Sequence, residues 1–232
     1  MQAVEFTLFS IDEDLVDEWK GSFQALVPSD LLDHTSFVHA SFKEMTTTFD
    51  CLVSPANSFG RFDGGFDQIL TETLAPLEDQ SALTRVAQAV LYERWVGFAP
   101  PGTCTLVPLA DTPCSANRVG CRYVALCPTM RLPASVSWHK EIVHNCVWSL
   151  LVEIDRHNRQ AAADASLAPI RSVGMTGFGT GVGGISAKVC ARQTALAFAY
   201  FHDAKTNPEK WKSLSWRAIS DMPLVRRLPM DD

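Results

Sequence analysis

The amino-acid sequence predicts an α/β fold of three layers, α/β/α, with a mixed and largely parallel central sheet. Apolar segments of strand length alternate with helical segments along the chain, which favours a sheet covered by helices on both faces. Two glycine-rich loops each follow a predicted strand and precede a predicted helix. In open α/β sheets, ligands bind at the loops that leave the carboxyl ends of the strands. The length of 232 residues suits one domain over residues 1–232.

Three strands and one helix are predicted before the first glycine-rich loop. Residues 3–9 alternate apolar and polar side chains and contain Val, Phe and Thr, which is typical of a strand. Residues 11–20 are acidic and are expected to form a helix. Residues 36–40 are predicted as a short strand, and residues 49–54 as a buried strand that ends at Pro55.

Helices dominate the middle of the chain. Residues 67–98 carry apolar side chains at helical spacing, and Pro76 predicts a break between two helices. Residues 104–109 and 122–127 are predicted as two further buried strands with a turn-rich segment between them.

The last third of the chain contains two strong helix predictions. Residues 137–157 have one continuous apolar face, and residues 187–201 are rich in alanine, with Ser186 as the N-cap. A strand is expected over residues 170–175, before the second glycine-rich loop. Residues 211–232 show no clear period, and we expect them to wrap the domain rather than add a layer.

Composition and charge exclude several classes of partner. Lys and Arg total 20 and Asp and Glu total 26, giving a formal net charge of −6. Proteins that bind nucleic acid usually have a basic excess, so a nucleic-acid partner is not expected. The N-terminus lacks the basic flank of a signal peptide, and the longest apolar run is too short to span a bilayer. We therefore expect no membrane partner and a location in the cytoplasm or the nucleus.

The cysteines do not follow a metal-binding or disulfide pattern. There are seven of them, with no C-x-x-C pair and no spacing that fits a structural zinc site. Reduced, buried thiols are the expectation, and no metal or cofactor is expected.

The first candidate site is the loop of residues 55–65, called here the asparagine loop, with the predicted helix start that follows it. Asn57 offers a donor and an acceptor, which suits a sugar diol. Gly64 and Gly65 allow a ligand to approach the backbone, and Asp67 adds a carboxylate at the first helical turn. When this loop is taken by itself, a plain turn with an N-cap is the favoured explanation of these residues.

The second candidate site is the segment of residues 176–186, called here the glycine loop. Five of its eight residues from 177 to 184 are glycine. No lysine follows in the Walker A position, and the G-x-G-x-x-G dinucleotide motif is not in its usual place. Unhindered backbone N–H groups, the hydroxyl of Thr180 and a helix N-terminus beyond favour a diphosphate ligand over a flexible turn.

Together the two loops resemble those of macrodomains over about residues 36–201. Residues 55–57 with 64–67 resemble the N-A-A-N-type loop and glycine cluster of that family, and residues 179–184 resemble its late S-T-G-x-x-G loop. The sequences of residues 54–60 and 127–130, together with the Ala-Arg-Gln run from Ala191, are most similar to those of a divergent macrodomain-like branch found in fungi and some phages.

The resemblance implies ADP-ribose or a related nucleotide as the ligand, and ADP-ribosylated proteins as partners. Asn57 would hold the distal ribose, and Gly64, Gly65 and Phe66 would line it and the adjoining phosphate. Backbone N–H groups of the glycine loop would bind the diphosphate. The residues implied there are Gly179, Thr180, Gly181, Val182 and Gly183. Asp67 falls where one hydrolase branch of the family has a catalytic Asp, and Asp63 is a second candidate carboxylate.

Three positions depart from the family pattern. Many macrodomains have an Asp that binds the adenine amino group, and the matching position here is Ser41. The hydrolase branch has a His one turn after its Asp, and this chain has Thr71. An aromatic residue common in the second loop is replaced by Gly183.

Three functions are compatible with these observations. The first is a hydrolase that removes ADP-ribose from a mono-ADP-ribosylated protein, or a phosphatase that acts on ADP-ribose 1″-phosphate, with Asp67 activating a water. The second is a non-catalytic reader of ADP-ribose. The third is a macrodomain scaffold that has lost nucleotide binding, which the missing adenine Asp favours and the intact glycine loop opposes.

Overall fold

Six strands form one sheet in the computed structural model, which describes residues 4–222. The strands are β1 (Glu5–Ser10), β2 (Thr35–His39), β3 (Cys51–Ser54), β4 (Thr105–Pro108), β5 (Tyr123–Leu126) and β6 (Ser172–Met175). Their order across the sheet is β2-β1-β6-β3-β5-β4. Neighbouring strands are parallel except β4 and β5, which are antiparallel. The prediction of a mixed, largely parallel sheet is confirmed.

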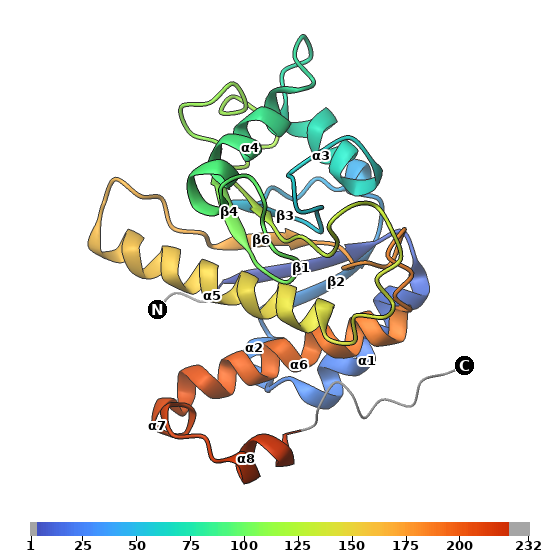
Figure 1. Cartoon of the computed structure of the whole chain (residues 1–232), viewed down its shortest axis with the longest axis vertical. Helices are drawn as coiled ribbons and strands as arrows, with labels where there is room; N and C mark the ends of the chain where they lie inside the picture. The colour runs from blue at the N-terminus through green and yellow to red at the C-terminus, as the bar shows by residue number, and fades with distance from the viewer. Residues whose placement is uncertain (1–3, 223–232) are drawn as a thin grey trace.

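Helices cover both faces of the sheet (Figure 1). The longer helices are α1 (Glu13–Leu26), α3 (Gly65–Leu74), α4 (Ala82–Trp95), α5 (Ile142–Ala163) and α6 (Ala187–Thr206). Shorter ones are α2 (Ser29–Leu32), α7 (Pro208–Lys212), α8 (Trp216–Asp221) and the 3₁₀ turn η1 (Phe42–Glu44). In Figure 1, α3 and α4 lie above the sheet and α1, α5 and α6 lie below it. The three predicted layers are therefore present.

Each face of the sheet has its own hydrophobic core. Successive side chains of a strand point to opposite faces. In β3, Cys51 and Val53 pack in the core formed with α1, α5 and α6, whereas Leu52 packs in the core formed with α3 and α4. This two-sided burial explains why the strand segments are continuous apolar runs.

The carboxyl ends of the five parallel strands lie at one edge of the sheet. The chain leaves that edge through residues 10–12, 40–42, 55–66, 127–133 and 176–183. The last two of the five pairs between β1 and β2 are Phe9 with Val38 and Ser10 with His39, so these strands end together. The asparagine loop and the glycine loop therefore leave the same edge.

One predicted helix begins later than expected. Its apolar face predicts a start at residue 137, but α5 begins at Ile142. The preceding residues form turns, in which the His139 N–H donates to the Val136 carbonyl at 2.8 Å. The Val136 N–H donates in turn to the Gly183 carbonyl at 2.9 Å, so a contact with the glycine loop holds this segment out of the helix. The predicted cap of α6 is confirmed, since Ser186 Oγ accepts from the Val189 N–H at 3.4 Å.

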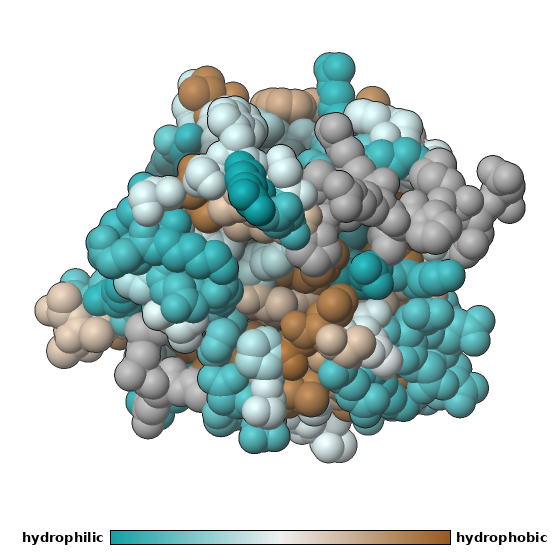
Figure 2. Space-filling view, turned by 90° about the horizontal axis from the view of Figure 1, so that it is seen from below, coloured by the Kyte–Doolittle hydropathy of each residue, from teal (hydrophilic) through white to brown (hydrophobic). Residues whose placement is uncertain are grey.

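The described part of the tail forms two short helices, of which α7 packs on α5 and α6. The Trp211 ring of α7 stacks on Trp148 of α5 at 5.5 Å between centroids, and its Nε1 donates to Asp203 of α6 at 2.7 Å. Figure 2 shows the molecule from below, with apolar side chains gathered near the middle of the face and hydrophilic ones around them. Residues 223–232 of the predicted tail lie outside the described residues.

Two observations bear on the expectations from composition. All seven cysteines are buried in the hydrophobic cores, as predicted. Among the helices of residues 4–222, none has the length and apolar character needed to cross a membrane.

Candidate functional site

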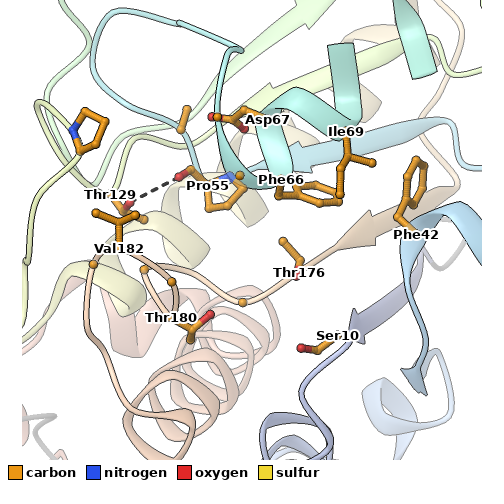
Figure 3. A pocket seen from close by; sticks show the side chains of 18 of the residues that line it. Ser10, Phe42, Pro55, Phe66, Asp67, Ile69, Thr129, Thr176, Thr180 and Val182 are labelled. Atoms are coloured by element: carbon orange, nitrogen blue, oxygen red, sulfur yellow. Dashed lines mark hydrogen bonds between the residues drawn. The ribbon is translucent and has the colours of Figure 1, made fainter. Parts of the chain in front are cut away.

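A cavity of about 710 Å³ lies at the carboxyl edge of the sheet. It is lined by residues from every segment that leaves a parallel strand, including all of the site residues predicted from the sequence. In Figure 3, Phe42, Phe66, Ile69 and Ser10 lie toward one end and Thr129 and Val182 toward the other. The two loops therefore line one cavity, as the parallel sheet predicted.

The Asn57 side chain is bonded within its own loop. Its Nδ2 donates to the Arg61 carbonyl at 2.8 Å. Its Oδ1 accepts from the backbone N–H groups of Phe59 at 3.1 Å and Arg61 at 3.3 Å. Asn57 therefore holds the shape of the loop, and one further N–H of its amide is left for a ligand.

The segment after β5 supports the asparagine loop from outside. The Thr129 N–H donates to the Ala56 carbonyl at 3.0 Å, and the Ser58 N–H donates to the Met130 carbonyl at 3.0 Å. Thr129 and Met130 also line the cavity. These bonds fix the loop at the sheet edge.

Helix α3 begins at the wall of the cavity. Its N-cap is Gly64, which has no side chain to bond the first-turn N–H groups. A Cβ atom built on Gly64 or Gly65 would meet no atom within 4 Å, so both residues face open space. The N-terminus of a helix attracts anions through such N–H groups.

Asp67 is a buried carboxylate in the first turn of α3. Only 9% of the residue is exposed, and the Ser54 hydroxyl at the end of β3 donates to its Oδ1 at 2.5 Å. Burial raises the pKa of Asp67 to about 7, against the opposing effect of the Ser54 bond, and the nearby Asp63 raises it further. Asp67 is therefore partly ionised at neutral pH, which suits a group that takes and returns a proton.

Asp63 lies in a different environment from Asp67. It forms an ion pair with Arg61, whose Nε donates to Asp63 Oδ2 at 2.8 Å. More than half of each side chain is exposed, at 58% for Arg61 and 59% for Asp63. Water screens such a pair, so it contributes little to stability.

The glycine loop is held by a few backbone bonds. The N–H groups of Gly184 and Ile185 donate to the carbonyls of Gly181 and Gly179, each at 3.0 Å. No hydrogen bond within residues 4–222 uses the N–H groups of Thr180, Gly181 or Val182. Consecutive free donors of this kind form an anion-binding turn.

Two glycines of this loop have opposite surroundings. A Cβ on Gly181 would meet no atom within 4 Å. A Cβ on Gly183 would lie 2.5 Å from the Gly179 carbonyl oxygen, a backbone atom that cannot move aside. The loop therefore excludes any side chain at position 183, which explains why no aromatic residue stands there.

The other two departures from the family pattern have local structural roles. Ser41 caps η1, since its Oγ accepts from the Lys43 N–H at 3.3 Å and its N–H donates to Glu44 at 2.9 Å. Thr71 is buried, and its hydroxyl donates to the Phe62 carbonyl at 2.7 Å.

The structure adds two kinds of residue that the sequence did not identify: Ser54, which bonds Asp67, and Phe9 and Phe42, which line the cavity. The sequence placed Ser54 at the end of a predicted strand and gave no signal that it contacts Asp67. The rings of Phe9 and Phe42 stack at 5.5 Å, and Phe66 lies 5.6 Å from Phe9 and 5.9 Å from Phe42. Phe66 was predicted from the sequence. Phe9 and Phe42 were not, and the one available signal was that each lies at a strand end or a helix start.

Comparisons with known proteins give structural matches. No protein-family model matches the chain, and no curated protein matches it. The macrodomain of Mycobacterium tuberculosis DarG is 17% identical over 70% of this chain and 89% of that chain, with a TM-score of 0.48. A mutant Oceanobacillus iheyensis macrodomain with ADPR is 15% identical over 72% and 86%, with a TM-score of 0.44.

A third solved structure is the Trypanosoma brucei macrodomain in complex with ADP. It is 18% identical over 70% of this chain and 53% of that chain, with a TM-score of 0.41. All three are macrodomains, the family that the two loops of this sequence resemble.

Proposed function

We propose that the cavity binds ADP-ribose or a related nucleotide and that the protein hydrolyses the ester that joins a carboxylate or a phosphate to the 1″ position of the distal ribose. The observation that carries this proposal is the pairing, in one cavity, of the free N–H groups of the glycine loop with the buried carboxylate of Asp67. The N–H groups suit a diphosphate, and a carboxylate with a pKa of about 7 suits a general base at neutral pH.

The diphosphate would bind backbone groups of the glycine loop rather than a basic side chain. Thr180, Gly181 and Val182 offer their N–H groups, and Gly181 leaves open space beside them. Gly179 and Gly183 allow the tight packing of the loop backbone that holds these groups in place. Arg61 is the lone basic residue among those lining the cavity in residues 4–222, and it is paired with Asp63. The N-terminus of α3 adds the positive end of a helix dipole.

The distal ribose would lie between the asparagine loop and the start of α3. The remaining N–H of Asn57 and the backbone of Gly64, Gly65 and Phe66 line this part of the cavity. A volume of about 710 Å³ is within the range of sites that bury a ligand of this size. The ribose would thus come close to Asp67, which the same helix turn supplies.

The reaction on a mono-ADP-ribosylated acidic side chain needs one water. Ionised Asp67 takes a proton from the water while the water oxygen bonds to C1″. The bond from C1″ to the carrier oxygen breaks, and the carrier carboxylate leaves with the electron pair. For ADP-ribose 1″-phosphate, the water attacks phosphorus, the P–O bond to the ribose breaks, and Asp67 returns its proton to the ribose oxygen.

A non-catalytic reader is the second candidate function. Thr71 favours it, because its hydroxyl is bonded to the Phe62 carbonyl and stands where the hydrolase branch has a histidine. A reader would bind ADP-ribose through the same loops without turnover.

Calorimetric titration tests the ligand. ADP-ribose should bind saturably, whereas AMP and ribose 5-phosphate should bind at least about tenfold more weakly because each lacks part of the bonded diphosphate and riboses. Hydrolysis is then assayed on a mono-ADP-ribosylated protein and on ADP-ribose 1″-phosphate. Binding without turnover of either substrate would support the reader, and no binding at millimolar ADP-ribose would overturn the proposal.

The substitution Asp67→Asn tests the general base. Asparagine keeps the volume and the acceptor for Ser54 but cannot take the proton, so turnover should fall roughly 10²–10⁴-fold. Affinity for ADP-ribose should stay equal or increase, because a negative charge beside the diphosphate is removed. The control is Asp14→Asn on the exposed first turn of α1. Unchanged turnover in Asp67→Asn would refute the role of Asp67.

A further inference from the structure

A short segment after β5 connects the two loops of the cavity. At one end of this segment, Met130 forms an isolated parallel bridge with Asn57 of the asparagine loop. At the other end, the Val136 N–H donates to the Gly183 carbonyl of the glycine loop at 2.9 Å. Residues 131–135, called here the strap, therefore run from one loop to the other.

The strap lies at the edge of the cavity and is exposed to solvent. Met130 and Pro133 line the cavity, and all residues of the strap are exposed. Figure 3 shows Thr129, which precedes this segment, and Val182 of the glycine loop at the same end of the cavity. The strap therefore forms part of the rim at which a ligand in this end of the cavity meets the solvent.

Three large apolar residues are exposed on this rim and beside it. Leu132 belongs to the strap, Val182 belongs to the glycine loop, and Trp138 lies in the turn that follows the strap. They are 58%, 67% and 72% exposed, and together they are called here the apolar rim. Residues 131–138 contain one charged residue, Arg131. Apolar side chains that gather beside a cavity, unlike single ones scattered over a surface, indicate contact with another molecule.

The strap begins where the distal ribose would lie. That sugar is placed beside Asn57, and Asn57 is the bridge partner of Met130. A group attached to the 1″ position would leave the cavity at this rim. The basic residue that lines the described cavity, Arg61, is already paired with Asp63, so this end offers apolar surface more than free positive charge. A phosphate gains little from such a surface, whereas an apolar side chain is stabilised when it is buried there.

We propose that the apolar rim binds the polypeptide that carries the ADP-ribose. The substrate is then a mono-ADP-ribosylated protein with an apolar residue next to the modified acidic side chain, and not ADP-ribose 1″-phosphate. This inference rests on the proposed function and extends it by naming the substrate class.

The first test compares two peptides that carry ADP-ribose. Each holds it on a glutamine side chain, whose amide link replaces the labile ester so that turnover does not disturb the titration. One peptide has leucine on both sides of the modified residue, and the other has serine. Calorimetry on the wild-type protein should give at least about tenfold tighter binding of the leucine peptide, as expected when an apolar side chain is buried. The serine peptide should bind about as tightly as free ADP-ribose.

The substitution Leu132→Ser should reduce the preference for the leucine peptide to about threefold or less. Affinity for free ADP-ribose should stay unchanged, because Leu132 does not line the cavity. Leu77→Ser is the matched control. Leu77 is an exposed leucine between α3 and α4 that does not line the cavity either, so this variant should keep the full preference.

The substitution Trp138→Ser is a second, independent variant of the apolar rim. It should also reduce the preference for the leucine peptide and leave the affinity for free ADP-ribose unchanged. Its matched control is Trp216→Ser at the start of α8, since Trp216 is equally an exposed tryptophan and does not line the cavity. Thermal melting checks that all four variants are folded.

Each outcome decides the proposal. Loss of the preference in either rim variant, with both controls unchanged, supports the apolar rim. Equal affinities of the two peptides for the wild-type protein would overturn it and leave the proposed function intact. So would a full preference in both rim variants, or a higher kcat/KM for ADP-ribose 1″-phosphate than for the leucine peptide with its ester link. If neither free ADP-ribose nor the peptides bind the wild-type protein, both the proposed function and this inference fail.

Discussion

The asparagine loop and the glycine loop line the same cavity but satisfy their polar groups in opposite ways. In the asparagine loop, side chains bond the loop itself: Asn57 bonds Phe59 and Arg61, and Arg61 pairs with Asp63. In the glycine loop, consecutive backbone N–H groups from Thr180 to Val182 have no partner within residues 4–222. One loop is fixed by its side chains, and the other keeps its donors for a ligand.

This difference matches the chemical group that each region positions. The first leads into the helix turn that carries a buried carboxylate, and such a group keeps a defined position when its supports are themselves fixed. Ser54 provides that support for Asp67 at 2.5 Å. The glycine loop holds no charge, and its donors are useful for binding because nothing else occupies them. We infer that chemistry depends on the first region and anion binding on the second.

Among these substitutions, we expect Gly181→Glu in the glycine loop to cause the largest loss of ligand affinity. A glutamate would enter the open space beside the free N–H groups and place a negative charge against the diphosphate. We expect ADP-ribose affinity to fall at least about 100-fold. The fold should be spared, because a Cβ at this position meets no atom within 4 Å. Calorimetry measures the affinity, and thermal melting checks the fold.

The control for this variant is Gly21→Glu. Gly21 lies on the exposed side of α1 and its Cβ would also meet no atom within 4 Å, so the two variants add the same charge in equally open surroundings. Gly21→Glu should keep its affinity for ADP-ribose. An unaffected affinity in Gly181→Glu would mean that the diphosphate does not bind the glycine loop.

The order of strands and helices could be predicted from the sequence because its signals are local. Continuous apolar runs mark the buried strands, and Pro76 lies between α3 and α4, as expected of a residue that ends a helix. The meeting of the two loops also followed from the sequence, since parallel strands place their carboxyl ends together. The late start of α5 could not be predicted, because the contact between Val136 and Gly183 that holds the preceding turns joins residues far apart in the chain.

The candidate site was predicted in part for the same reason. Asp67 stood out by its place after two glycines, but its pairing with Ser54 depends on how β3 and α3 pack. Asp12, which caps α1, was not identified from the sequence. Its place in the cavity depends on the pairing of β1 with β2, and short strands do not reveal their neighbours.

Replacing Asn57 with alanine should have a moderate effect on stability. It removes three hydrogen bonds that hold the asparagine loop, so the free energy of unfolding should fall by about 2 kcal/mol. Chemical denaturation measures this loss. Ser58→Ala is the control in the same loop, because it removes the 3.3 Å bond to the Met130 carbonyl and should cost less than about 1 kcal/mol. Full stability with lost affinity in Asn57→Ala would instead assign Asn57 to the ligand alone.

Replacing Ser54 with alanine should have the smallest effect of these substitutions. It should shift the pH dependence of turnover, which tests whether Ser54 supports Asp67. The base must be ionised, so wild-type turnover should rise as the pH increases through about 7, the pKa of Asp67. The Ser54 bond favours the ionised form and lowers that pKa, so its loss should move the rise to higher pH by about one unit.

The direction of this shift in the pH midpoint distinguishes two roles of Ser54. Ser54 either favours the ionised form of Asp67 or only stabilises the fold. Below the rise, turnover of Ser54→Ala should fall about tenfold relative to the wild type, because fewer Asp67 groups are ionised. Well above it, the two proteins should have nearly equal turnover, since Asp67 is ionised in both. Ser54→Thr keeps a hydroxyl and should retain the wild-type midpoint. A rate that drops equally at every pH in Ser54→Ala would show that Ser54 supports the fold and not the ionisation of Asp67.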